Sequence, residues 1–396
     1  MKIVFGVLIG IIILMLLVIA HELGHFIMAR KNGVKVNEFG IGFPPRAIAW
    51  IKKNGKWTRL PKSEWQKPQD SLILSLNFLP IGGFCAMDGE SDSDRRKGTF
   101  GAATFWGKTK ILFGGVLMNW LVAAIILTIL AFTGMPQFIN NQFYLENDAQ
   151  ITGEGITIAE VLPDSPAAKV GMQSGDKLIA IDNRLITLPT EVTDYGTSHA
   201  GNTGKYTILR GEEEIVLEPK LNPAGSEYAL GISMTSGQTF IRSTWSAPIV
   251  GVGTTLQLTG ETFRSLGELV WNLVSGVVQQ FSFNSEVREA GQSALQSAGD
   301  SVSGPVGIIG VIFPAFAESG LTNLAFLAAL VSVSLACMNI LPIPALDGGR
   351  WLLIAIYRLR RKTLTKETEE RIVSRAMMVL LMLIAIISIL DITRFF

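Results

Sequence analysis

Long apolar runs separated by polar stretches dominate the pattern along the chain. The runs are Ile3–Ala20, Ile111–Phe132, Leu321–Leu341 and Ala376–Leu390. About 20 apolar residues in a helix are enough to cross the hydrocarbon core of a bilayer. We therefore expect four membrane spans, the last of them short. The first run could also be a secretory signal peptide, because Lys2 precedes it, but its length and its lack of a small-residue cleavage site favour a span.

Two regions between the spans show other periodicities. Residues 153–235 alternate strand-like runs with Gly, Asn and Asp turns, a pattern that predicts a small β-rich domain. Its expected strands are Ile156–Val161, Lys177–Ile181, Tyr206–Leu209 and Ile215–Leu217, with a short helix after Ser165. Residues 248–278 have amphipathic helical stretches that include Glu261, Arg264 and Glu268. Those charges favour a helix lying on the membrane surface over another span.

Residues 31–103, between the first two spans, do not read as a simple loop. Val36–Trp50 and Leu72–Met87 are apolar and glycine-containing, the second with an expected turn at Pro80–Gly83, and a charged tract, Asn54–Asp70, separates them. This pattern predicts a β-hairpin, which is either re-entrant or interfacial beside the membrane, or packed on the helices from the cytoplasm. In the first case its edge strand could pair with an extended substrate.

The fold class that follows is a multi-pass α-helical membrane protein with four spans, a membrane-associated β-hairpin region and an inserted β-rich extracytoplasmic domain. The expected segments are a first membrane helix (1–30), a cytoplasmic or re-entrant β segment (31–103), a second membrane helix (104–134), the β-rich domain (150–236), extracytoplasmic amphipathic helices (240–303), a third membrane helix with its following segment (304–349), and a cytoplasmic connection with the fourth membrane helix (350–396).

Composition and charge agree with a membrane protein and set its orientation. Of 396 residues, 48% are hydrophobic and 17% charged, against about 25% charged in ordinary soluble domains. The net charge of +1 gives no reason to expect nucleic acid as a partner. Basic residues outnumber acidic ones in 30–110, and the reverse holds in 136–322. The positive-inside rule therefore places 30–110 in the cytoplasm and 136–322 outside.

The candidate chemistry begins where the first apolar run ends, at His21-Glu22-Leu23-Gly24-His25. Helix positions i and i+4 share a face, so His21 and His25 can hold one metal ion while Glu22 lies beside it. This is the arrangement of zinc peptidases, in which a histidine pair needs a third ligand from elsewhere. Ionisable groups in a membrane helix cost about 2.5–3.5 kcal/mol each on insertion scales, so a chance occurrence is disfavoured.

Asp347 is the candidate third ligand. It follows the third span and two helix-breaking prolines, and Gly348 and Gly349 after it are expected to let the backbone bend sharply. An aspartate in such an apolar setting needs a charge partner, and a metal is the natural one. With residues 240–303 outside, the third span delivers Asn339 and Asp347 to the cytoplasmic face that carries the histidine pair. His199, the third histidine of the chain, is expected on a soluble surface.

Together these motifs resemble those of the site-2 protease family of intramembrane zinc metalloproteases, and in particular its bacterial regulated-proteolysis members. The resemblance covers most of the chain. It rests first on His21–His25 and on Asn339 with Leu346–Gly349. Leu79–Phe84 with Met87, Gly89 and Glu90 is similar to the family's cytoplasmic strand motif, and Gly114, Gly115 and Asn119 are similar to its second-span motif. Ser165–Asp176 is similar to its PDZ domain, and Ser303–Gly307 to the loop ahead of its third span. Val116 stands where the family usually has proline, Arg350 replaces a common histidine, and one PDZ unit is present where some members have two.

The resemblance implies a zinc endopeptidase, with one Zn²⁺ per chain, in the bacterial plasma membrane. Its substrates would be transmembrane segments of single-span proteins, either anti-sigma factors or remnant signal peptides, cut near the cytoplasmic face while the PDZ-like domain lies outside. Glu22 would be the general base and Asn339 would contact the substrate. Candidate substrate-binding residues are Gly82, Gly83, Phe84 and Asn119, although Asn119 could instead make a helix–helix hydrogen bond. The oligomeric state is left open.

Two other classes of function compete with a protease. A membrane adaptor could carry a PDZ module and a purely structural metal site, but such a site needs no general base and Glu22 is present. A transporter could use the intramembrane acids as an ion path, but the chain has few spans and no pair of inverted halves.

Overall fold

The computed structural model describes residues 2–53, 55–65, 71–139, 141–153, 156–186 and 188–395. Asn54 and residues 66–70 of the expected charged tract lie outside the described residues. The chain forms two compact units, Met1–Leu127 with Thr255–Phe396, and Thr128–Thr254.

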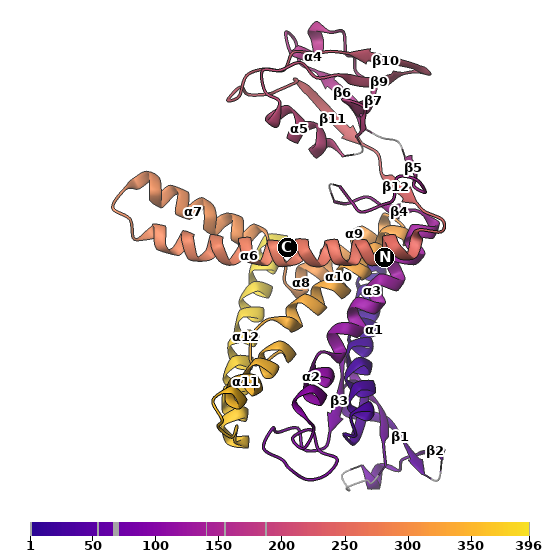
Figure 1. Ribbon diagram of the computed structural model, residues 1–396, viewed down its shortest axis with the longest axis vertical. Helices are drawn as coiled ribbons and strands as arrows, with labels where there is room; N and C mark the ends of the chain where they lie inside the picture. The colour runs from indigo at the N-terminus through magenta and orange to yellow at the C-terminus, as the bar shows by residue number, and fades with distance from the viewer. Residues whose placement is uncertain are drawn as a thin grey trace. The chain divides into compact units, whose positions relative to one another are not determined.

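Within the described residues, four helices are long and apolar enough to cross a membrane (Figure 1). They are α1 (Lys2–Lys31), the pair α2 (Phe105–Leu112) and α3 (Gly114–Thr133), α10 (Leu321–Ile340) and α12 (Lys366–Phe395). The second span lies within the expected segment 104–134, begins before the apolar run Ile111–Phe132, and is interrupted at Phe113, between α2 and α3. The chain is a multi-pass membrane protein.

Close helix packing holds α1 in place. A Cβ on Gly24 would lie 2.1 Å from the carbonyl oxygen of Gly114, so α1 and α3 meet backbone to backbone. At the other end of α1, a Cβ on Gly6 would lie 2.5 Å from Pro314. The segment starting at Ser303–Gly307, expected to be a loop, is instead largely helical: α8 (Pro305–Gly307), a π-helical turn (Ile308–Ile312) and α9 (Phe313–Glu318).

A β-sheet lies against α1 in the same unit. Its strands β1 (Val36–Lys53), β2 (Lys56–Arg59) and β3 (Ile73–Met87) are arranged in the order β2-β1-β3. β1 and β3 form one long antiparallel ribbon, and the ribbon bends so strongly that Gly40 pairs with both Ser75 and Phe84. The structure assigns one strand through the turn expected at Pro80–Gly83, but this strand reverses its direction there. Residues 73–76 run parallel to residues 38–41 of β1, whereas residues 83–86 run antiparallel to them. Gly82, with φ of 82°, lies in this region, where the ladder register shifts.

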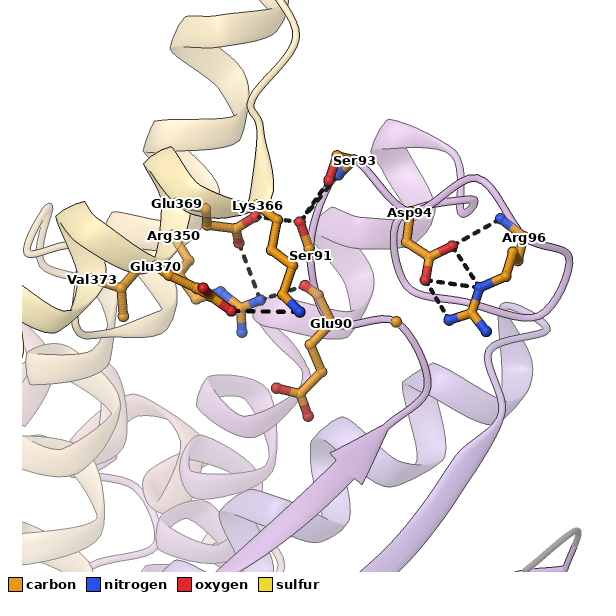
Figure 2. Close-up of a pocket in the computed structure, with 11 residues that line it drawn as sticks. Glu90, Ser91, Ser93, Asp94, Arg96, Arg350, Lys366, Glu369, Glu370 and Val373 are labelled. Carbon is orange, nitrogen blue, oxygen red and sulfur yellow. Dashed lines mark hydrogen bonds and ion pairs between the residues drawn. The ribbon is translucent and has the colours of Figure 1, made fainter. Parts of the chain in front are cut away.

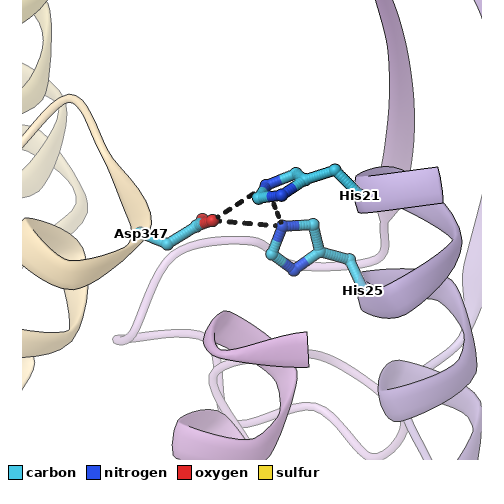
Figure 3. Close-up of side chains that lie close together, drawn as sticks. All are labelled: His21, His25 and Asp347. Carbon is cyan, nitrogen blue, oxygen red and sulfur yellow. Dashed lines mark hydrogen bonds and ion pairs between the residues drawn. The ribbon is translucent and has the colours of Figure 1, made fainter. Parts of the chain in front are cut away.

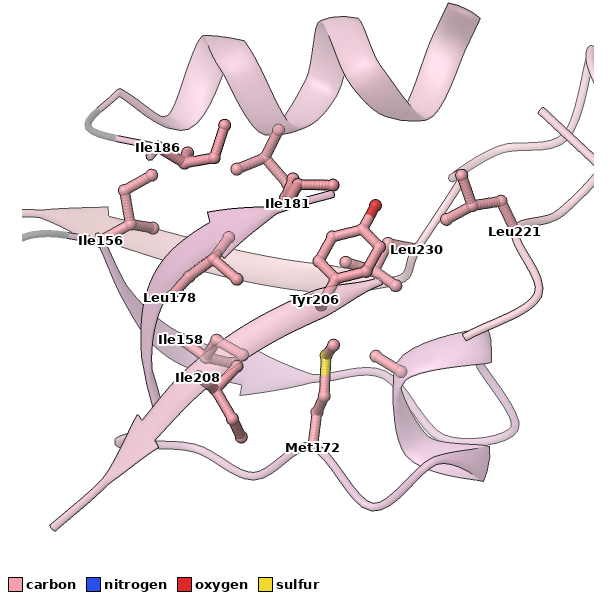
Figure 4. Close-up of a cluster of buried hydrophobic side chains, with 12 residues drawn as sticks. Ile156, Ile158, Met172, Leu178, Ile181, Ile186, Tyr206, Ile208, Leu221 and Leu230 are labelled. Atoms are coloured by element: carbon pink, nitrogen blue, oxygen red, sulfur yellow. The ribbon is translucent and has the colours of Figure 1, made fainter. Parts of the chain in front are cut away.

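The other unit contains the expected β-rich region. Its largest sheet has the strand order β10-β9-β7-β6-β11, with β8 beside β7. The elements are β6 (Ile156–Val161), α4 (Pro166–Lys169), β7 (Lys177–Ile181), β8 (Arg184–Leu185), α5 (Pro189–Ser198), β9 (Tyr206–Arg210), β10 (Glu213–Leu217) and β11 (Ile232–Ser236). The four expected strands and the short helix are present, whereas α5 and β11 were not expected. Ile158, Leu178, Tyr206 and Ile208 belong to its buried core (Figure 4).

The remaining elements connect these parts. β4 (Met135–Pro136), β12 (Thr239–Arg242) and β5 (Gln150–Gly153) make a small sheet in the order β4-β12-β5. The amphipathic stretch at 248–278 lies within one continuous helix, α6 (Ala247–Gln280), and α7 (Ser285–Asp300) follows it. The two helices pack closely where Gly276 meets Gly291. After the third span the chain breaks and restarts as α11 (Asp347–Leu359).

Candidate metal centre

Three side chains from two helices converge on one point (Figure 3). His21 and His25 lie one turn apart on α1, and their Nε2 atoms are 3.1 Å apart. Asp347, the first residue of α11, places Oδ2 at 3.2 Å from each of these nitrogen atoms. The histidines are buried, at 8% and 7% exposure. The structure thus brings together the three residues that the sequence singled out as metal ligands.

The geometry of this group fits a zinc ion. Tetrahedral zinc with bonds of about 2.0–2.1 Å separates its ligand atoms by about 3.3–3.4 Å. The separations of 3.1 and 3.2 Å among His21, His25 and Asp347 are within a few tenths of an ångström of that value. Three protein ligands also leave the fourth position open, as in catalytic zinc sites.

The second ring nitrogen of His25 fixes the tautomer that a metal needs. Its Nδ1 lies 2.8 Å from the carbonyl oxygen of Ile111, the last but one residue of α2. A proton on Nδ1 donates to this carbonyl and leaves the lone pair of Nε2 directed at the metal position. The sequence could not point to Ile111, because its contribution is a backbone atom.

Asn119 lies behind His21, with its side-chain amide 3.3 Å from His21 Nδ1. It is fully buried on α3, and its own carbonyl accepts a hydrogen bond from Ser332 of α10. Its Oδ1 is buried and has no hydrogen-bond partner in the part of the chain that the structure describes. Rotation of the amide would place this oxygen at the ring N–H that His21 carries when Nε2 binds a metal. The contact between α3 and α1 corresponds to the helix–helix hydrogen bond considered from the sequence.

Glycines let the helices approach the ligands closely. A Cβ on Gly115 would lie 2.5 Å from Cε1 of His21, so only glycine fits where α3 passes this ring. A Cβ on Gly348 would lie 2.1 Å from the carbonyl oxygen of Ile340. The expected sharp bend at Gly348 and Gly349 is wrong, because both lie in the first turn of α11. Their role is to let this turn pack on the segment that precedes it.

Glu22 lies between the histidine pair and strand β3. A Cβ on Gly83 of β3 would be 3.7 Å from Cγ of Glu22. The acid is therefore adjacent to the metal ligands on one side and to a strand on the other. Such a placement suits a group that moves a proton next to a bound peptide.

The other expected substrate-binding residues lie on β3 and α10. Gly82 and Phe84 belong to β3, and the rings of Phe84 and Phe43 stack with centroids 6.5 Å apart. Asn339 is in the last turn of α10, half-buried, and its Nδ2 donates to the carbonyl oxygen of Leu335 at 2.9 Å. His199 is exposed beside Tyr195 in the other unit, as expected for a surface histidine.

A histidine pair and a glutamate on one apolar helix, with a carboxylate from a second helix, define the class of membrane-embedded zinc peptidases. The family model for peptidase family M50 matches residues 9–384. The chain therefore belongs to peptidase family M50, the site-2 protease family, and is a zinc metalloprotease.

Relatives match over nearly the full length. A protein of Clostridium perfringens named "Putative zinc metalloprotease" is 29% identical over 95% of this chain and 95% of its own. A protein of a Nostoc species with the same kind of name is 27% identical, over 95% of this chain and 93% of its own. Among solved structures, the PDZ domain of the SdrC-like protein from Listeria monocytogenes is 27% identical, with a TM-score of 0.20, and covers 22% of this chain and 93% of that domain.

Proposed function

We propose that this metalloprotease cleaves the transmembrane segments of single-span proteins, anti-sigma factors or remnant signal peptides, in regulated intramembrane proteolysis. The observation that carries the proposal is the placement of the metal group. His21 and His25 lie on a helix long enough to span a membrane, and Asp347 begins the helix that follows another such span. A peptide bond that reaches them is therefore at the membrane.

His21, His25 and Asp347 would hold one Zn²⁺ per chain, with the hydrogen bonds of Ile111 and Asn119 orienting the two rings. Zinc at this position supplies a Lewis acid that polarises the scissile carbonyl and lowers the pKa of water. Glu22 takes the proton of the attacking water and later passes it to the leaving amine.

The substrate must reach this site in an extended form, because a helix hides its carbonyls in its own hydrogen bonds. Strand β3 passes directly beside Glu22 at Gly83. Gly82, Gly83 and Phe84 are proposed to pair with the unwound substrate backbone, as in strand addition. Asn339 would hold the substrate backbone or the developing oxyanion from the end of α10.

We further propose a location in the bacterial plasma membrane, with the metal group near the cytoplasmic face. The excess of basic residues in 30–110 and of acidic residues in 136–322 supports this orientation. The domain at 150–236 would then be a PDZ-like module outside the membrane that filters substrates by size or by an exposed chain end.

The test combines zinc content with cleavage of a model single-span peptide, for the full-length protein in detergent. We expect wild type to hold about one zinc and to cleave, Glu22→Gln to hold zinc without cleaving, and Asp347→Ala to lose zinc. His199→Ala is the matched control and should behave as wild type. Cleavage by Glu22→Gln would place the base elsewhere. A wild-type protein that holds zinc but does not cleave would favour the adaptor function, and one that holds no metal would contradict the ligand assignment.

A further inference from the structure

Arg350, one turn after Asp347 on α11, makes contacts that the proposed mechanism does not use. Its Nη2 donates to the carbonyl oxygen of Glu90 at 2.8 Å and lies 3.4 Å from Oε1 of Glu369 on α12 (Figure 2). Its guanidinium carbon is 5.4 Å from the ring centroid of Phe100, which is fully buried. Contacts with a carbonyl, a carboxylate and a ring hold this side chain in one place.

Glu369 anchors the same region to α12. Its side chain is only 7% exposed, and its Oε2 accepts the backbone N–H of Asp92 at 2.9 Å. Asp92 forms an ion pair with the buried Lys108 of α2. These contacts connect the loop after β3 with α2, α11 and α12. Breaking one of them would leave a buried charge without its partner, which is costly.

Glu90 connects Arg350 to the proposed substrate strand. While its carbonyl accepts from Arg350, its carboxylate accepts the backbone N–H of Met87, the last residue of β3, at 3.2 Å. The same strand passes Glu22 at Gly83. One arginine thus connects the helix that begins with Asp347 to the strand that lies beside Glu22.

We propose that Arg350 is a positioning residue for Asp347. Its hydrogen bond to Glu90 fixes the first turn of α11 and thereby the distance from Asp347 Oδ2 to the two histidine nitrogens. The inference rests on the zinc ligands proposed above. The competing explanation is that Arg350 only forms a stabilising ion pair with Glu369, and the two explanations predict different effects on metal binding.

The experiment measures zinc affinity by competition with a chelator, and the melting temperature, on the full-length protein in detergent. Arg350→Met removes both polar contacts and should weaken zinc binding by about 10–100-fold, as loss of a partner that orients a ligand does. Glu369→Gln keeps the Glu90 contact and should leave zinc affinity unchanged while lowering the melting temperature. Arg358→Met, the same substitution later on α11, is the matched control: it removes a contact with the Phe105 ring but no described contact with Glu90 or Glu369, and should leave zinc affinity unchanged.

Two results would overturn the proposal. The first is an unchanged zinc affinity in Arg350→Met. The second is an equal loss of zinc affinity in Glu369→Gln and Arg350→Met, because loss of the ion pair between Arg350 and Glu369 would then explain the whole effect. If Arg350→Met does not fold, Arg350→Lys takes its place, since lysine keeps the charge beside Glu369 but lacks the planar fork, and it should also weaken zinc binding. Asp347→Ala separates the two proposals. If Asp347→Ala binds zinc as wild type does, the ligand assignment fails. If Asp347→Ala loses zinc while Arg350→Met binds it with wild-type affinity, the ligand assignment stands and only the positioning role fails.

Discussion

Substitution of Gly115 by alanine should disturb the metal site, because the added methyl group would collide with the ring of His21. The added Cβ would lie 2.5 Å from Cε1, 2.6 Å from Nε2 and 2.7 Å from Nδ1 of His21. Carbon atoms in contact are normally about 3.5–4.0 Å apart, so the ring or α3 must move by about 1 Å. Metal–ligand distances tolerate only about 0.2 Å, which makes this displacement large for a ligand.

The expected effect is larger on metal binding and catalysis than on folding. A displacement of about 1 Å at a reacting centre can reduce activity by about 100-fold. Overpacking of a tight interior typically destabilises by about 1–3 kcal/mol. Zinc affinity, peptide cleavage and melting temperature should therefore all fall in Gly115→Ala, with cleavage falling most.

Gly267→Ala on α6 is the control, because a Cβ there has no neighbour within 4 Å. Glycine in a helix interior is less favourable than alanine by about 0.5–1 kcal/mol, so this variant should be neutral or slightly stabilised. The reasoning would be refuted if Gly115→Ala bound zinc and cleaved the peptide as wild type does.

Two predictions concern the β-rich domain. Arg210 holds the pKa of the Asp176 carboxyl below its usual value, through hydrogen bonds of 2.7 Å to a side chain that is 2% exposed. Because the pKa of Asp176 is lower in the folded than in the unfolded state, its ionised carboxylate stabilises the folded domain at pH values above the unfolded pKa of about 3.9. This stabilisation is lost as the pH falls from that value through the lower pKa of the folded state. The protection of residues 156–217 against hydrogen exchange in the intact protein, measured relative to the intrinsic exchange rate at each pH, should thus fall below about pH 4 in wild type but change less over this range in Asp176→Asn. Among the described residues the buried hydroxyl of Tyr206 has no hydrogen-bond partner, so Tyr206→Phe should slow exchange or leave it unchanged, and faster exchange would contradict this.

The metal ligands could be predicted because their sequence signal is strong. Polar, ionisable groups in apolar helices are rare enough that His21, His25 and Asp347 stand out from the amino-acid pattern alone. Their helical spacing and the parity of the spans predict that they lie at one face of the membrane. The prediction depended on local patterns and on a few rules that hold for any bilayer.

The parts that the sequence did not reveal depend on tertiary contacts. The bend of the β1–β3 ribbon pairs Gly40 with two distant parts of β3, and no local pattern specifies such pairing. Gly348 suggested a flexible bend, yet its role is to admit the carbonyl of Ile340, which can be seen only when both segments are placed. The sequence of α5 has few apolar residues, and only Val192 and Gly196 are buried, so it gave too weak a signal to indicate a helix.

The interruption at Phe113 has a consequence for anyone who would redesign this protein. In an unbroken helix the carbonyl of Ile111 would be bonded to the backbone four residues on, whereas here it lies in the final turn of α2 and accepts Nδ1 of His25. Joining α2 and α3 into one regular helix would engage this carbonyl in a backbone hydrogen bond, which would compete with the contact that orients the imidazole. A redesigned protein should therefore keep the interruption at Phe113 as well as the proposed ligands.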